Sequence, residues 1–159
     1  MGLLFSRRFA VPTPSPTPSD LIAVAAMIFG FGIVVIMFRV QRELWVREHH
    51  QKWEHWTPWA DWLIFASVLL VGCLTILSLL AFPGVRRSEA LAAASCGSAV
   101  VLQIGYFPAI FAHYRMFFGK QRIKDNVPRE KGEPAEKVFV SLTVAIAAFT
   151  FVFIFCQHH

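Results

Sequence analysis

Four long runs of the sequence contain no Asp, Glu, Lys, Arg or His, and this feature restricts the fold more than any other. The runs cover residues 21–38, 63–82, 90–112 and 138–156, and they are 18, 20, 23 and 19 residues long. About 20 residues of helix cross the hydrocarbon core of a bilayer, and a helix bonds its own backbone polar groups internally. The sequence therefore predicts an all-α membrane protein with four transmembrane helices.

Lys and Arg are distributed unequally between the two sides of these predicted helices. The N-terminal segment, the connection 83–89 and the C-terminal tail together hold four: Arg7, Arg8, Arg86 and Arg87. The connections 39–62 and 113–137 hold the other eleven. The positive-inside rule predicts that these two connections are cytoplasmic and that both termini lie outside the cytoplasm. We therefore expect an antiparallel bundle in a bacterial inner membrane. The same topology accounts for the net charge of +5, so the charge indicates no nucleic-acid partner.

The chain divides into two parts by composition. Residues 1–19 form a Pro-rich tail, which we expect to be an extended spacer, and residues 20–157 form the four-helix transmembrane domain. Helix-capping residues stand near the ends of the apolar runs. The predicted capping and starting pairs are Ser19 with Asp20, Thr57 with Pro58, Ser88 with Glu89, and Pro134 with Glu136.

The connection after the first run contains no glycine or proline between residues 39 and 56. Glu43 precedes Arg47 by four positions, and Glu48 precedes Lys52 by four, an order that stabilises a helix. These features predict that the first helix continues beyond the lipid as a cytoplasmic stalk.

All five tryptophans lie on or near this cytoplasmic side: Trp45, Trp53, Trp56, Trp59 and Trp62. Indole rings favour the headgroup level of a bilayer, so an interfacial belt explains them most simply. Aromatic clusters also carry binding energy at interfaces, and the alternative is a docking surface, made by the last four, for a partner or a quinone-like ligand.

Histidines near the same side are candidate ligands for haem or a divalent metal. His55 and His113 are expected at similar depth, and His50 and Glu54 stand four positions apart with His49 adjacent. The simpler interpretation is that these are solvated interfacial histidines, since no established metal-binding spacing is present.

The third run carries small and polar residues at helical spacing. Gly97 and Gly105 belong to a stripe that repeats every four residues, which allows another helix to approach closely. Ser95, Ser98 and Gln103 are hydrogen-bonding groups, and Pro108 removes one backbone donor. Bonding between helices explains these residues, and a path for an uncharged solute is the alternative.

The function follows mainly by elimination. No Asp, Glu, Lys, Arg or His lies inside a run, so we expect no buried charge of the kind that ion-coupled transporters require. The sequence also contains no recognisable catalytic constellation, which makes an enzyme the less favoured class. We expect an accessory, assembly or scaffold subunit that binds a membrane-protein partner or its own copies within the lipid bilayer. The alternatives are a haem- or metal-binding redox protein and a homo-oligomeric channel or facilitator.

Overall fold

The computed structural model describes residues 17–49, 58–113 and 134–158, and these residues are almost entirely helical. The elements are α1 (Pro18–His49), α2 (Trp59–Leu69), the π-helix η1 (Leu70–Ile76), α3 (Leu77–Ala81), α4 (Arg86–His113) and α5 (Pro134–His158). Four helical segments are long and apolar enough to cross a membrane: Pro18–Trp45, Trp59–Ala81, Arg86–His113 and Pro134–Gln157. The prediction of an all-helical chain with four membrane-spanning candidates is confirmed. Three of the helical segments extend beyond both ends of their apolar runs, whereas the second begins before its run and ends at Ala81, one residue inside it.

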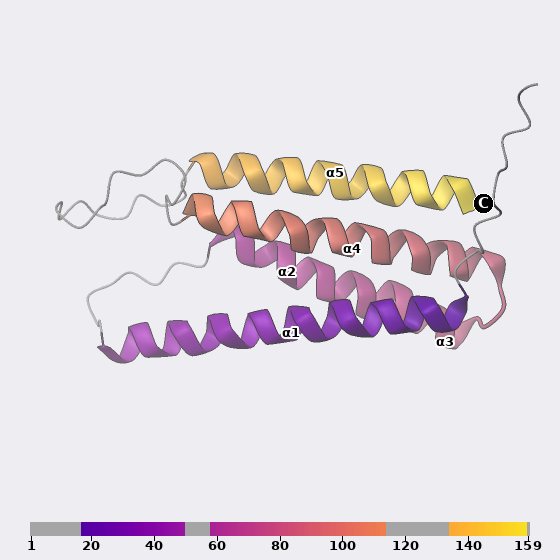
Figure 1. Cartoon of the computed structure of the whole chain (residues 1–159), viewed down its shortest axis with the longest axis horizontal. Helices are drawn as coiled ribbons and strands as arrows, with labels where there is room; N and C mark the ends of the chain where they lie inside the picture. The colour runs from indigo at the N-terminus through magenta and orange to yellow at the C-terminus, as the bar shows by residue number, and fades with distance from the viewer. Residues whose placement is uncertain (1–16, 50–57, 114–133, 159) are drawn as a thin grey trace, which may run out of the picture.

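The long helices lie side by side (Figure 1), and α4 is the internal one. In the most apolar part of α4, 61% of the residues are buried, compared with 22% in α1 and 11% in α5. Helix α4 contacts α1, α2, η1, α3 and α5, and it contributes residues to all three apolar clusters of the described interior. The end of α1 and the end of α4 lie at the same end of the molecule as the beginnings of α2 and α5.

Close helix packing depends on glycines at defined positions. A Cβ atom at Gly105 of α4 would overlap Thr143 of α5, and one at Gly97 would overlap Ile154 of α5. A Cβ atom at Gly32 of α1 would likewise overlap Val68 of α2. A Cβ atom at Gly30, in contrast, would meet nothing within 4 Å, because this glycine faces outward. Small residues therefore bring α5 onto α4 and α1 onto α2.

The helix starts differ in part from those expected from the sequence. The first helix begins earlier than predicted from Ser19 and Asp20, because Thr17 precedes α1 and forms reciprocal bonds with Asp20, which caps the helix from inside its first turn. The Thr17 N–H donates to Asp20 Oδ2 at 2.9 Å, and the Asp20 N–H donates to Thr17 Oγ1 at 3.3 Å. This is a capping box that has Pro18 as the first helical residue.

The start of α4 is also earlier than predicted. Ser88 lies inside the helix, and its hydroxyl donates to the carbonyl oxygens of Phe82 at 2.8 Å and Val85 at 2.7 Å. The hydroxyl therefore fastens the turn between α3 and α4, where Gly84 adopts a positive φ of 75°.

Candidate functional site

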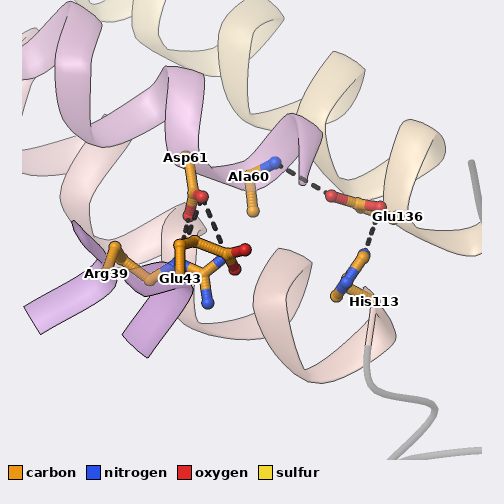
Figure 2. Close-up of polar contacts among 6 residues, drawn as sticks. All are labelled: Arg39, Glu43, Ala60, Asp61, His113 and Glu136. Atoms are coloured by element: carbon orange, nitrogen blue, oxygen red, sulfur yellow. Dashed lines mark hydrogen bonds and ion pairs between the residues drawn. The ribbon is translucent and has the colours of Figure 1, made fainter. Parts of the chain in front are cut away.

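Ionisable side chains from α1, α2, α4 and α5 gather near the end of the bundle where α4 finishes and α2 and α5 begin (Figure 2). The first of two groups centres on Glu136, the third residue of α5, whose side chain is completely buried. Its Oε1 accepts a hydrogen bond from the Ala60 N–H of α2 at 3.0 Å. Its Oε2 lies 3.0 Å from Nδ1 of His113, the last residue of α4. One carboxylate thus joins three helices.

The bond to Ala60 has a local cause. The first N–H groups of a helix have no partner within the helix, and a preceding Ser, Thr, Asp or Asn usually accepts from one of them. Pro58 occupies the cap position of α2 and makes no side-chain cap bond. Glu136 supplies the acceptor from another helix, and a carboxylate also favours the positive end of the α2 dipole. Thr57, the predicted cap, lies outside the described residues.

The second group joins α1 to α2. Arg39 Nε donates to Asp61 Oδ1 at 3.0 Å, and Arg39 Nη2 donates to Oδ2 at 2.9 Å, which makes a bidentate pair. The Arg39 and Asp61 side chains are only 14% and 20% exposed. Glu43, one turn beyond Arg39, lies 3.7 Å from Arg39 Nη2 and is more exposed. The Arg39–Asp61 pair is therefore the closer contact.

These groups correct the expectation that the transmembrane bundle contains no buried charge. Glu136 lies outside the apolar run 138–156, but α5 begins at Pro134 and its first turn packs against α2 and α4. Arg39 and Asp61 likewise lie just outside their runs, in turns that neighbouring helices cover. Burial at this end is produced by packing between helix ends, which the hydropathy of a single run does not report.

The predicted histidine sites are only partly described. His113 is nearly buried and is paired with Glu136, a residue predicted only as part of a helix start. His49 is the last residue of α1. The predicted partners His50, Glu54 and His55 lie outside the described residues. Among the residues that are described, no group of three or more His, Cys, Asp or Glu is placed to hold a metal ion.

The tryptophans that the structure describes around the start of α2 face outward. Trp59 and Trp62 are both exposed beside the buried Ala60, and the Trp62 ring makes an edge-to-face contact with Phe65 at 5.9 Å. Trp53 and Trp56 lie outside the described residues. Exposed indoles at this level fit a lipid interface and a protein interface equally well.

The polar residues predicted in the third helix bond to other helices. Gln103 Nε2 donates to the Ile28 carbonyl of α1 at 2.8 Å and to Ser67 Oγ of α2 at 3.3 Å. Ser98 Oγ donates to the Ala147 carbonyl of α5 at 3.0 Å.

Ser95 and Pro108 are the other two polar or helix-breaking residues predicted in α4, and they lie before Ser98 and after Gln103 in the chain. The hydroxyls of Ser95 and Thr75, the latter in η1, are 2.7 Å apart, and both side chains are completely buried. Pro108 lies within α4 and is half-buried. Helix α4 is therefore hydrogen-bonded through its side chains to each of its long neighbours.

The sequence contained a signal for the missed residues. Asp61 and Glu136 each follow a proline, Pro58 or Pro134, within the first turn of a helix that starts on the same side. Arg39 and His113 stand at the finish of the two runs that end on that side, so the topology alone places complementary groups together.

Comparison of the chain with protein-family models, curated proteins and solved structures gives no match.

Proposed function

We propose that this protein is a small accessory, assembly or scaffold subunit of a membrane complex. In this proposal the four long helices form an antiparallel bundle in a bacterial inner membrane, with both termini outside the cytoplasm. The excess of Lys and Arg in the connections 39–62 and 113–137 supports that orientation. The 32 residues of α1 extend about 48 Å, which exceeds a hydrocarbon core of about 30 Å and supports a cytoplasmic stalk.

The main support for the proposal is that the polar side chains bond one helix to another. Glu136, Gln103 and Ser98 each bond from one helix to another, and Arg39 of α1 does the same. Their hydrogen-bonding capacity is used in holding the helices together. This use favours a structural role over a facilitator, because a solute path needs polar groups that can turn toward the solute.

The outward surface supports the same proposal. Helices α1 and α5 expose large apolar side chains along their length, including Met27 and Phe31 of α1 and Phe149 and Phe153 of α5. Beyond Arg39, the stalk also exposes Leu44, among charged residues that suit water. A surface of this kind can contact both lipid and the helices of a partner.

Photo-crosslinking from the outward faces tests the proposal. A photoreactive amino acid is placed singly at Met27, Leu44 or Phe149, all of which are exposed, and native membranes are irradiated. The proposal predicts a defined polypeptide adduct from at least one face, while Val138, exposed on another part of α5, serves as a matched comparison. Adducts with lipid alone from every position would contradict it.

A haem- or metal-binding redox protein is the second candidate, and one observation favours it. A ligating histidine commonly uses its other ring nitrogen to contact a carboxylate, and His113 Nδ1 lies 3.0 Å from Glu136 Oε2. In this candidate His113 acts with His55, or the metal is held by His49, His50 and Glu54. A haem absorption band, or bound metal, that disappears in His113→Ala would support the candidate. Purified protein without either would contradict it.

A further inference from the structure

The last part of α1 extends past the starts of α2 and α5 and carries exposed apolar side chains (Figure 1). Arg39 still contacts α2 through Asp61, whereas Val40 and Leu44, further along α1, are 47% and 59% exposed. In the proposed orientation this part is the cytoplasmic stalk, where water makes the burial of apolar side chains favourable. A cover for Val40 and Leu44 would therefore stabilise the protein.

Val40 and Leu44 continue a line of exposed residues that begins inside the proposed membrane span. The line follows alternating steps of three and four residues, which keep side chains on one face of a helix. We call this line the α1 stripe. Its exposed members are Ala23, Ala26, Gly30, Ile33, Met37, Val40 and Leu44. The stripe covers three heptads, the length from which such a repeat indicates a coiled coil.

The α1 stripe lies on the side of α1 that is turned away from the bundle. Ala25 and Ile28 are buried in an apolar cluster, and Gly32 packs against Val68 of α2. Gly30 points to nearly the opposite side from Gly32, because each residue turns a helix by about 100°. A Cβ atom at Gly30 would meet nothing within 4 Å. Every outward face of a membrane span is apolar, so the continuation of this face into the stalk is what distinguishes it.

We propose that two copies of this chain pair through α1, with the α1 stripe of one helix packed in parallel against the α1 stripe of the other. The pairing rests on the orientation and the cytoplasmic stalk proposed above. Copies inserted in the same orientation have parallel α1 helices, and a two-fold axis along the membrane normal places each stripe against its own counterpart. The alternating steps keep two such helices in contact along their length, a requirement that lipid does not impose.

The residues of the α1 stripe change in size along the helix. The first three members are Ala or Gly, which let two helix backbones approach closely inside the membrane. The last three, from Met37 to Leu44, are larger and lie toward the stalk, where the burial of apolar surface provides a driving force of its own. The pairing leaves the outward face of α5 available to the partner subunit.

The charges beside the α1 stripe permit two copies to approach. Arg39 and Arg42 balance Glu43 and Glu48, so these four residues carry no net charge. Glu43 and Glu48 flank the stripe, and in a parallel pair Glu43 of one copy faces Glu48 of the other. Glu43 lies 3.7 Å from Arg39 Nη2 of its own helix, and this contact offsets the repulsion.

Disulfide crosslinking in native membranes tests the pairing. A single cysteine replaces Met37 or Leu44 in a chain whose two exposed cysteines, Cys73 and Cys156, are changed to serine. Phe38→Cys is the matched control, because Phe38 is exposed at the same depth but lies off the stripe. After oxidation we expect a dimer of twice 18.0 kDa from the two stripe positions and much less from the control. Equal yields at all three positions, no dimer, or a disulfide to another polypeptide in its place would overturn the proposal.

A substitution at Gly30 separates pairing from folding. Gly30→Leu directs a side chain away from its own bundle, so the fold should be retained. We expect it to lower the yield of the Met37→Cys dimer about fivefold or more, because it overpacks the contact between copies. Gly30→Ala stays small and should leave the yield near that of the parent. An unchanged yield in Gly30→Leu would overturn the pairing alone, because the accessory-subunit proposal depends on the presence of other polypeptides in the native particle.

Discussion

The Glu136 carboxylate at the start of α5 accepts a hydrogen bond from the Ala60 N–H at the start of α2, 76 positions earlier in the chain. The two helices are not consecutive, yet the first turn of one completes the cap of the other. A helix that begins after Pro58 without a side-chain cap therefore depends on a distant residue for its start. This dependence ties the local structure of α2 to the assembly of the whole bundle.

The first prediction concerns this bond. Glu136→Ala leaves the buried Ala60 N–H without an acceptor, and the expected loss is about 1–3 kcal/mol in the free energy of unfolding. Glu136→Gln keeps an acceptor oxygen and should lose less. The measurement is reversible unfolding of the full chain in detergent micelles. Glu43→Ala, which removes only a long and exposed contact to Arg39, is the control, and an equal loss in both alanine variants would contradict the assignment.

A second prediction compares two glycines in membrane-spanning helices. Gly105→Ala places a methyl group against Thr143 and should destabilise the α4–α5 contact by about 1–3 kcal/mol. Gly30→Ala meets open space and should be neutral or stabilising by up to about 1 kcal/mol, because alanine favours a helix. Unfolding under the same conditions measures both. Similar effects at the two positions would show that Gly105 does not set the helix spacing.

A third prediction addresses the Arg39–Asp61 pair. Both side chains are mostly covered. Arg39→Gln removes the guanidinium that faces Asp61, and Asp61→Asn removes the closer carboxylate of the two that the structure places near Arg39, so either change alone should loosen α1 from α2. The double variant is expected to lose less than the sum of the single losses, with a coupling of about 1 kcal/mol. Additive losses in this double-mutant cycle would mean that the pair contributes nothing as a unit.

The location of Lys and Arg gives a fourth prediction. Single cysteines replace Arg87 and Lys137, which are both exposed, in a background without Cys73 and Cys156. A thiol reagent that cannot cross the membrane is expected to label Arg87→Cys in intact cells and Lys137→Cys only after the membrane is opened. The opposite labelling pattern would reverse the proposed topology.

The fold and the polar end were predictable from the sequence to different degrees. The four apolar runs specify the helices because about 20 uncharged residues match the thickness of a bilayer. The contacts of Glu136 were not predictable from its own segment, because they depend on which helices meet and at what height. The sequence placed Pro134 and Glu136 at a helix start, but only the three-dimensional arrangement reveals that α2 receives the carboxylate.

The most direct test of the central proposal is the native mass and subunit composition of the full chain extracted from its own membranes in a mild detergent. Native mass spectrometry gives both quantities in one experiment. The proposal predicts a particle much heavier than 18.0 kDa that contains other polypeptides in fixed ratio. A particle that contains only this chain, as a monomer or as copies of itself, would contradict the accessory-subunit proposal.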